Sequence, residues 1–310
     1  MITTIVLNPA VDKVYFVDGF QAGGLYRVRN TVKSAGGKGI NVARVAASLG
    51  ETVSTIGFKA GGTGEWLQSE LQKLGVHTDF IEVKGESRTN NNIVDRTANV
   101  ETELLETGPF VTCADMDKFL DSYRCILKDT TVLVCSGGLP EGVPTNFYRT
   151  LADIAKSCGV KFILDTSNEM LEEGIEAKPY MVKPNLRELG AYVKKQLKEV
   201  GEIIEACRYI TSKGVELVAA SMGKDGALLV SEDVVLYAEP PDISVVNTIG
   251  SGDSMAAGFA VGLSRGHTME EMLRLGMACA VANTQFMEIG VVSRELVENY
   301  LKEIRIREIS

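Results

Sequence analysis

The sequence predicts an α/β fold with three layers, in which helices cover both faces of a mostly parallel central sheet. Three observations support this prediction. Hydrophobic residues make up 45% of the 310 residues and charged residues 24%, which is typical of a folded globular chain. Short apolar runs bounded by Gly, Asp or Asn recur along the chain. Segments with helical spacing of apolar residues lie between these runs, and this alternation is typical of parallel sheets.

The central strands are expected where the apolar runs are compact and rich in β-branched residues. These runs lie at residues 2–7, 52–58, 131–136, 160–165, 180–183 and 215–221. Helices are predicted between them at residues 38–49, 63–74, 115–127, 145–157, 186–198 and 200–213. In the first helix Ile40, Ala43 and Ala47 recur at helical spacing, and Gly50 ends the pattern. From residue 252 onward nearly the whole chain has helical periodicity.

Two segments, 13–33 and 88–106, interrupt this alternation of strand and helix. In both, apolar and polar residues alternate with no helix between them, which predicts strands with one face exposed to water. We expect them to form a small antiparallel sheet that projects as a lid or a subunit contact. Because the chain has no internal repeat, linker or low-complexity tract, it is predicted to be a single domain, 1–310, with this lid inserted.

Charge and composition exclude several classes of function. With 32 Lys and Arg against 41 Asp and Glu, the net charge of −9 argues against nucleic-acid binding or an anionic membrane surface. The six Cys form no C-x-x-C pair, and the two His, His77 and His267, lie far apart, which argues against zinc sites and His-dependent triads. No signal peptide or apolar stretch of roughly 18 residues is present, so we expect a cytoplasmic protein.

The strongest motif is a glycine turn at the start of a predicted helix. Gly250, Ser251 and Gly252 precede Asp253 there, so backbone N–H groups and the helix N-terminus favour an anion beside a carboxylate. The alternative is that Asp253 only occupies the first turn of the helix and has no catalytic role. The turn is not a dinucleotide fingerprint because Met255 replaces the third glycine, and no P-loop exists elsewhere in the sequence.

A second glycine-rich turn precedes the helix predicted at 38–49. Gly36, Gly37 and Gly39 surround Lys38, and Asn41 follows in the first turn. Such glycines permit close approach of a ligand, and the Asn41 amide offers both a donor and an acceptor to sugar hydroxyls. Since glycine turns before helices are common, a purely structural turn remains the alternative.

Three shorter motifs follow predicted strands, at the sheet edge where α/β proteins bind ligands. Their polar and glycine residues are Asp12, then Lys183, Asn185 and Glu188, then Ser221, Gly223 and Gly226. Each motif alone fits an ordinary turn. Together they are expected to surround one crevice.

The motifs taken together resemble the PfkB (ribokinase-like) family of sugar kinases. They are L-N-P-A-x-D, G-G-K-G-x-N-V-A, S-G-x-L-P-x-G, K-P-N-x-x-E, S-x-G-x-x-G and T-x-G-x-G-D-S-x-x-A-G-F, in family order from residue 7 to residue 259. The opening motif and G-E-S-R-T-N at 85–90 are most similar to the branch of fructose-1-phosphate kinases (1-phosphofructokinases) and tagatose-6-phosphate kinases. The resemblance implies a ribokinase-like α/β/α fold with a small β lid.

The resemblance also assigns roles on the nucleotide side. It implies that Asp253 is the catalytic base and that the amides of Gly250, Ser251 and Gly252 form an anion hole. The residues that would line the ATP site are Lys183, Asn185, Ser221, Gly223 and Gly226, with Asn283 near the adenine. Asn185 and Glu188 match the element that is associated with Mg²⁺ in this family, through water.

On the sugar side, the resemblance implies that Asp12 and Asn41 hold hydroxyl groups while Gly37 allows close approach. The other residues that match sugar-side motifs are Asn90 and Ser136. The cations expected to hold the sugar phosphate are Arg88, Lys38 and Arg27, of which Arg88 is the most informative because a guanidinium binds phosphate bidentately. For Arg27 a solvated position on the lid is the alternative.

Two positions depart from the family pattern. Gly138 stands where the S-G-S-L-P motif has its second serine, and Asn92 stands where T-R-x-N-x-K has lysine. These changes leave the kinase assignment intact and put the identity of the phosphohexose in question.

The leading hypothesis is therefore an ATP- and Mg²⁺-dependent kinase that converts fructose 1-phosphate to fructose 1,6-bisphosphate. Tagatose 6-phosphate is the second substrate considered, and a nucleoside or simple sugar is the third. A sensor that binds sugar phosphate without turnover is the alternative from another class, and a nicotinamide-dependent reductase is disfavoured by the missing fingerprint. The predicted lid exposes apolar residues that need to be covered, so we expect a homodimer that forms through the lid. These residues are Tyr15, Phe16, Leu25, Ile93, Leu104 and Leu105.

Overall fold

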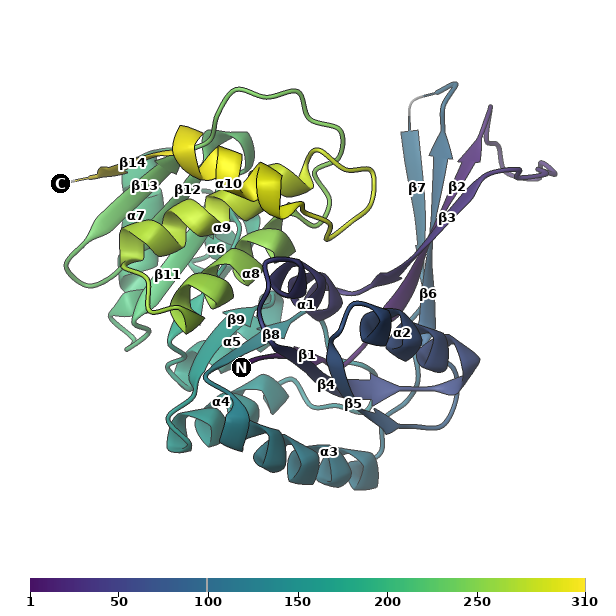
Figure 1. Ribbon diagram of the computed structural model, residues 1–310, viewed down its shortest axis with the longest axis horizontal. Helices are drawn as coiled ribbons and strands as arrows, with labels where there is room; N and C mark the ends of the chain where they lie inside the picture. The colour runs from purple at the N-terminus through teal and green to yellow at the C-terminus, as the bar shows by residue number, and fades with distance from the viewer. Residues whose placement is uncertain (99, 310) are drawn as a thin grey trace.

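The computed structural model describes residues 1–98 and 100–309. It consists of a large body around one ten-stranded sheet, and a four-stranded sheet that projects from one end of the body (Figure 1). Residue 99 of the predicted lid segment 88–106 and residue 310 of the predicted domain lie outside the described residues. Within the described ranges, no helix is long and apolar enough to cross a membrane.

The ten-stranded sheet is parallel through its middle and antiparallel at one side. In spatial order its strands are β5 (His77–Glu82), β4 (Val53–Lys59), β1 (Ile2–Val6), β8 (Val132–Ser136), β9 (Lys161–Asp165), β10 (Met181–Val182), β11 (Leu217–Ser221), β12 (Ala227–Val230), β13 (Val235–Glu239) and β14 (Arg305–Glu308). Pairing is parallel from β5 to β11 and antiparallel from β11 to β14. All six predicted central strands are confirmed, and four further strands extend the sheet at its two sides.

Helices cover both faces of this sheet, as predicted. They are α1 (Lys38–Ser48), α2 (Gly61–Lys73), α3 (Cys113–Ile126), α4 (Phe147–Ser157), α5 (Asn168–Glu176), α6 (Leu186–Tyr192), α7 (Val200–Thr211), α8 (Ser251–Ser264), α9 (Met269–Asn283) and α10 (Arg294–Glu303). Side chains of α1, α2, α8, α9 and α10 pack on one face, and those of α3 to α7 pack on the other. Along β1, Ile2 and Val6 join the first core and Ile5 joins the second, since successive strand residues point to opposite faces.

One predicted helix is wrong in its second half. The helix expected over 186–198 ends at Tyr192, and the chain reverses at Lys194, whose φ of 55° is left-handed. Lys195 N then donates to Gly190 O, which caps the short helix α6. Helix α5 was not among the predicted helices.

The projecting sheet is formed by the two segments predicted as a lid. Its order is β3 (Thr31–Gly36), β2 (Ala10–Val17), β6 (Arg88–Asp95) and β7 (Val100–Leu105). Each hairpin, β2–β3 and β6–β7, is antiparallel as expected, whereas β2 and β6 join the two hairpins in parallel. Residues 18–30 form no strand, so Arg27 lies in an exposed connection rather than on a lid strand.

The outer ends of the two hairpins are tied together by Asp95. Its carboxylate accepts backbone N–H bonds from Gly19 and Phe20 in one hairpin, at 2.9 and 2.7 Å, and from Thr97 and Ala98 in the other, at 2.9 and 3.2 Å. Four donors on one buried carboxylate satisfy the turns of both hairpins at once. The lid is therefore held together at its tip as well as along its strands.

Candidate active site

A cavity of about 910 Å³ lies where the carboxyl ends of β9, β10 and β11 face the N-terminus of α8. The predicted site residues that line it are Lys38, Lys183, Asn185, Glu188, Ser221, Gly223, Gly226, Ser251, Gly252 and Asp253. They come from motifs spread over more than two hundred positions of the chain. The structure thus brings together the glycine turn of α8, the first turn of α1 and the two motifs predicted on the nucleotide side.

The N-terminus of α8 carries the strongest of the predicted motifs. Gly250 is the residue before the helix and has a left-handed φ of 82°, which places Ser251 and Gly252 in the first turn. The first N–H groups of a helix have no partner within it, so they favour an anion beside this turn. Asp253 is 7% exposed, and its Oδ2 accepts a hydrogen bond of 2.8 Å from Asn41 Nδ2.

The carboxyl group of Asp253 has an altered acidity. Burial and the negative charge of Asp165 raise its pKa to about 6, against the opposing effects of Lys38, Asn41 and Lys183. A carboxylate with a pKa just below neutrality is ionised at physiological pH and is a stronger base than an exposed aspartate. Asp253 therefore has the environment of a general base.

Asp165 lines the cavity and is a candidate site residue that the sequence motifs did not include. It ends β9, is 1% exposed, and its Oδ1 lies 3.2 Å from Lys183 Nζ and 3.5 Å from Lys38 Nζ. Its negative charge raises the pKa of Lys38, so this lysine is held as a cation at the cavity. The only signal in the sequence is an aspartate at the end of an apolar run, in the same position as the other strand-end motifs.

The N-x-x-E element forms a reciprocal cap at the start of α6. Asn185 Oδ1 accepts from Glu188 N, and Glu188 Oε2 accepts from Asn185 N, both at 2.9 Å. Both side chains line the cavity while they stabilise this helix start. Among the described residues no cluster of three or more His, Cys, Asp or Glu side chains could hold a metal ion.

The turn after β11 forms the opposite wall of the cavity. A short 3₁₀ turn, η2 (Gly223–Asp225), leads into Gly226, where a side chain would collide with Ala238 O. Tyr237 on β13 supports this turn because its hydroxyl donates to Asp225 O at 3.0 Å. The Arg307 guanidinium of β14 lies 4.7 Å from the centre of the Tyr237 ring.

The placement of Asn283 contradicts the role expected from the resemblance. Its side chain is fully buried, donates to Ile249 O at 2.8 Å and accepts from Gly290 N at 2.9 Å. It does not line the cavity, whereas its neighbours Ala280 and Thr284 do. Asn283 therefore joins the loops around the start of α8 and does not face an adenine.

The sugar-side residues meet at the base of the lid. Asn90 Nδ2 donates to Asp12 Oδ1 at 2.8 Å, and Arg88 Nη1 lies 3.4 Å from Asn90 Oδ1. Burial raises the pKa of Asp12, while the hydrogen bond from Asn90 and the charge of Arg88 oppose this effect. A Cβ at Gly36 would lie 1.9 Å from Asp12 Oδ2, so a side chain there would displace this carboxylate.

The remaining sugar-side predictions have different outcomes in the structure. Gly37 precedes α1 with a φ of 106° and brings that helix start close to Pro9. Ser136 ends β8, and its Oγ is buried with no hydrogen-bond partner, as is Asn41 Oδ1. Arg27 is exposed and does not line the cavity, so the structure does not bring it to the other site residues.

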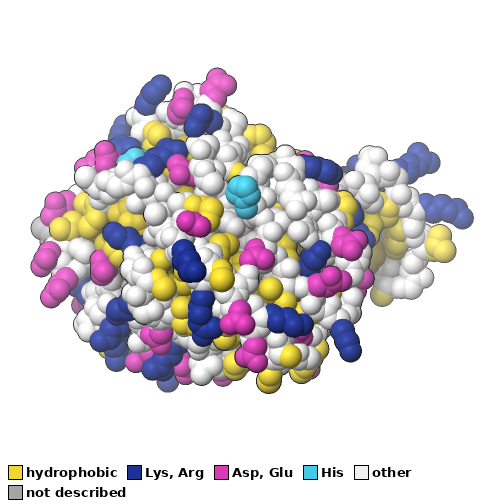
Figure 2. All heavy atoms as spheres, turned by 60° about the horizontal axis from the view of Figure 1, so that its bottom comes forward, with side chains coloured by type: hydrophobic (Ala, Val, Ile, Leu, Met, Phe, Trp, Pro, Cys, Tyr) yellow, Lys and Arg dark blue, Asp and Glu magenta, His cyan; other side chains and the backbone are white. Residues whose placement is uncertain are grey.

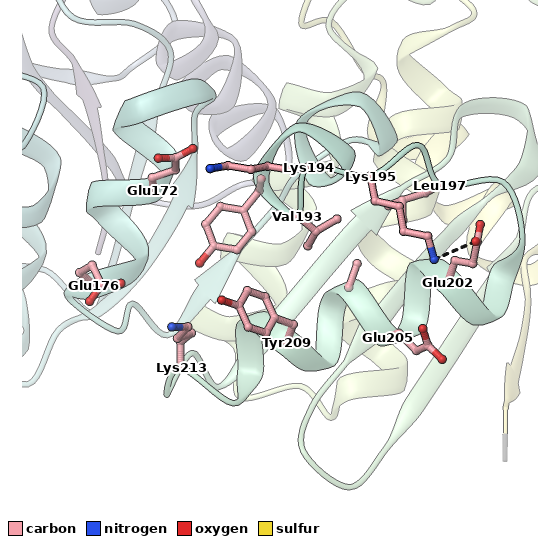
Figure 3. Close-up of a pocket in the computed structure, with 12 residues that line it drawn as sticks. Glu172, Glu176, Val193, Lys194, Lys195, Leu197, Glu202, Glu205, Tyr209 and Lys213 are labelled. Carbon is pink, nitrogen blue, oxygen red and sulfur yellow. Dashed lines mark ion pairs between the residues drawn. The ribbon is translucent and has the colours of Figure 1, made fainter.

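A second cavity, of about 630 Å³, lies between α5, α6 and α7 and contains no predicted site residue (Figure 3). Its centre is formed by Tyr192 and Tyr209, whose ring centres are 6.2 Å apart. Two of its lysines are engaged by neighbours: Lys195 binds Glu202 at 2.9 Å, and Lys213 Nζ lies 5.2 Å from the Tyr209 ring centre.

A buried carboxylate at the N-terminus of a helix, with two lysines that line the same cavity, is the arrangement of a phosphotransferase site on an α/β/α fold. The chain belongs to the pfkB family of carbohydrate kinases, because the pfkB family carbohydrate kinase pattern matches residues 5–290. This confirms the resemblance seen in the motifs and identifies the protein as a sugar kinase.

Named relatives agree with this assignment. The chain is 35% identical to 1-phosphofructokinase of Bacillus subtilis over 306 residues, which cover 99% of each sequence. It is 34% identical to tagatose-6-phosphate kinase of Staphylococcus epidermidis over 312 residues, which cover each sequence fully. Phosphofructokinase-2 of Escherichia coli, solved in complex with potassium, superimposes with a TM-score of 0.91 at 28% identity and covers 97% of this chain and 98% of its own.

Proposed function

We propose that the protein transfers the terminal phosphoryl group of ATP to a hydroxyl of a ketohexose monophosphate, with fructose 1-phosphate as the first substrate. The observation that carries this proposal is the Asn41–Asp253 hydrogen bond. It joins the helix that begins at the sugar-side glycine turn to the base beside the amides of α8. A sugar hydroxyl and a terminal phosphate would meet at that point.

The transfer step follows from these groups. Asp253 takes the proton from the C6 hydroxyl of fructose 1-phosphate as the hydroxyl oxygen attacks the terminal phosphorus of ATP. The bond from that phosphorus to the bridging oxygen breaks, and ADP leaves with the electron pair. The amide of Gly252 stabilises the charge on the transferring group, whereas the Ser251 amide donates to Thr248 O at 3.3 Å. Lys38 and Lys183 contribute positive charge beside Asp253. The products are fructose 1,6-bisphosphate, ADP and the proton on Asp253.

Mg²⁺ fits the donor set that faces the nucleotide side. The Glu188 carboxylate and the Asn185 amide are hard oxygen donors, and Glu188 uses one oxygen for the helix cap. Asn185 and Glu188 would hold the ion through water, and the ion would neutralise the charge of the ATP phosphates. The residues of this chain would then orient the phosphates toward α8.

Recognition of a phosphorylated sugar is assigned to Arg88. The guanidinium lies at the base of the lid, where its Nε donates to Asn8 O at 3.1 Å and its Nη1 approaches Asn90. These contacts fix the plane of the guanidinium beside Asp12, so its remaining N–H groups can bind a phosphate in a defined direction.

Tagatose 6-phosphate is the second substrate we consider. Asn92 and Gly138 differ from the pattern of fructose-1-phosphate kinases. Asn92 Nδ2 donates to Glu101 Oε2 at 3.2 Å on the lid, where a lysine would bring a cation. A sensor without turnover is disfavoured because the base and the helix start that a kinase needs are both intact.

A substrate panel tests the proposal. Rates of ADP release are measured with ATP and Mg²⁺ and with fructose 1-phosphate, tagatose 6-phosphate, fructose 6-phosphate or fructose. We expect the highest kcat/KM for fructose 1-phosphate and a bisphosphate product in stoichiometric yield with ADP. A higher kcat/KM for fructose than for every phosphohexose would overturn the role of Arg88, and no transfer to any sugar would favour the sensor.

We further propose that the lid mediates a homodimer. Leu104 and Leu105 on β7 are 56% and 61% exposed, and Leu25 in the β2–β3 connection is 83% exposed. Figure 2 shows hydrophobic side chains on the projecting sheet, together with basic side chains at its outer end. A second copy would cover these leucines. Light scattering at micromolar concentration should give a dimer mass, and Leu105→Asp should give the monomer.

A further inference from the structure

The guanidinium of Arg44 connects two backbone segments, one that lies beside Asp12 and one that packs against the residue before α8. Arg44 lies on α1 with a side chain 15% exposed. Its Nη1 donates to Ile289 O at 3.0 Å and to Ala35 O at 3.4 Å. Its Nη2 lies 3.7 Å from Glu288 Oε2. Both carbonyl groups belong to segments outside α1, so one side chain joins three parts of the fold.

The first segment supports the sugar side. Ala35 lies near the end of β3 and pairs with Val11 of β2, the residue before Asp12. The next residue, Gly36, lies directly against the Asp12 carboxylate. Any displacement of Ala35 O would therefore displace the backbone that confines Asp12 at the base of the lid.

The second segment supports the transfer side. A Cβ at Gly250 would lie 2.6 Å from Ile289 Cγ2, and a Cβ at Gly290 would lie 2.7 Å from Asn41 Oδ1. Gly290 N also donates to the buried Asn283. The Ile289–Gly290 segment thus packs against both the residue before α8 and the amide that binds Asp253.

We propose that Arg44 is a positioning residue that holds the sugar-binding end and the phosphoryl-transfer end of the site in register. The proposal rests on the proposed kinase function. A guanidinium suits this task because it stays charged and its several N–H groups have fixed directions. Arg44 is absent from the residues that line the cavity, so it acts through the two backbone segments rather than on a substrate.

A mechanical link of this kind couples the two substrate sites. A sugar phosphate that orders the base of the lid would also order, through Ala35 O, Arg44 and Ile289 O, the start of α8. Sugar binding would then change the affinity for nucleotide by some factor, and nucleotide would change the affinity for sugar by the same factor. Loss of Arg44 removes the link while both sites keep their own binding groups.

The test compares Arg44→Met with Arg44→Lys and with a matched control, Arg294→Met. Arg294 also donates to a main-chain carbonyl at α1, Leu49 O at 2.7 Å, and it does not line the cavity. We expect kcat with fructose 1-phosphate to fall at least about tenfold in Arg44→Met, because small displacements of reacting groups have large effects on rate. Arg294→Met should keep kcat within about twofold, and Arg44→Lys, which can still donate to one carbonyl, should recover part of the loss.

A binding measurement separates positioning from a general loss of structure. The Kd of a non-hydrolysable ATP analogue is measured by calorimetry with and without fructose 1-phosphate. In the wild type the sugar phosphate should change this Kd, and in Arg44→Met the ratio of the two Kd values should be about one. Without sugar, the Kd of the analogue should be similar in both proteins.

Three results would overturn the role of Arg44. These are an unchanged kcat in folded Arg44→Met, an equal loss in Arg294→Met, and the absence of any effect of sugar phosphate on the Kd of the analogue in the wild type. A wild type that transfers phosphate to no sugar would instead overturn the proposed function. The two failures are therefore distinguishable.

Discussion

Asn41 and Asp253 are 212 positions apart in the sequence, yet the Asn41 amide donates a 2.8 Å hydrogen bond to the Asp253 carboxylate. The bond fixes the orientation of the proposed base and also opposes the rise in its pKa. Asn41 thus influences both where the base lies and the pH at which it works. The first prediction uses this relationship.

We expect kcat to fall as the pH falls through about 6, because the base is active only when it is ionised and burial raises its pKa to about 6. In Asn41→Ala the carboxylate loses a donor that lowers its pKa, so the acid limb should move to higher pH. The measurement is kcat at saturating substrates between about pH 5 and about pH 8. Asn92→Ala is the control, and an unmoved limb in Asn41→Ala would contradict the assignment.

Replacing the base itself should separate chemistry from binding. Asp253→Asn keeps the shape of the side chain but cannot accept the proton, so kcat should fall by about 10²- to 10⁴-fold. The affinity for an ATP analogue, measured by calorimetry, should stay within about threefold, since the amides of α8 remain. Asp242→Asn changes another carboxylate that lines the cavity and should keep its kcat. Equal activity of the two variants would exclude Asp253 as the base.

Arg88→Ala should weaken the binding of the sugar phosphate. A charged hydrogen bond is worth about 1.5–3 kcal/mol, which corresponds to a rise in KM of about 10- to 100-fold. The KM for ATP should change little. Arg96→Ala is the matched control, because Arg96 lies just beyond the other end of β6 and pairs with Asp18 at the surface. If both variants raise the KM for the sugar phosphate equally, the phosphate is bound elsewhere.

Tyr237→Phe should weaken nucleotide binding while the sugar site is unaffected. The variant removes the hydrogen bond to Asp225 O that supports the turn before Gly226. A neutral hydrogen bond contributes about 1 kcal/mol, so the KM for ATP should rise about fivefold. Tyr209→Phe, in the second cavity, serves as the control. A changed KM for the sugar phosphate in Tyr237→Phe would contradict this prediction, because the turn would then also affect sugar binding.

Asp95→Asn should destabilise the lid in a pH-dependent manner. Burial opposes the ionised form, but the backbone N–H donors outweigh it and hold the pKa of Asp95 below its usual value. The carboxylate therefore stabilises the fold above the unfolded-state pKa, and this contribution is lost as the pH falls through the lower folded-state pKa. We expect a lower Tm for Asp95→Asn at neutral pH and a smaller difference in acid. Asp18→Asn at the same lid end should change Tm little.

The central sheet could be predicted because buried parallel strands are continuous apolar runs. Strands β12 to β14 are short and antiparallel, and their pattern is too weak to separate from turns. Alternation revealed the lid strands but not the parallel pairing of β2 with β6, since both pairings give the same period of two. The early end of α6 depends on the left-handed backbone at Lys194, and a lysine in the sequence does not indicate this conformation.

The sequence predicts those candidate site residues that belong to a motif of several residues. It does not predict single residues whose contacts are with distant parts of the chain. Asp165 ends its strand as one acidic residue, and its role appears only when Lys38 and Lys183 lie beside it. Arg44 contacts carbonyl groups that no side-chain pattern reveals. Asn283 was misjudged because a buried asparagine that joins loops has the same sequence signature as one that faces a ligand.

The long sequence separations within the site also constrain its biosynthesis. The pair of Asp12 and Asn90 is 78 positions apart, so the lid cannot close while the growing chain is shorter than its second hairpin. The chain acquires its base only when α8 emerges from the ribosome. Nascent or truncated chains that end before this helix would carry the sugar-side residues and lack the proposed base.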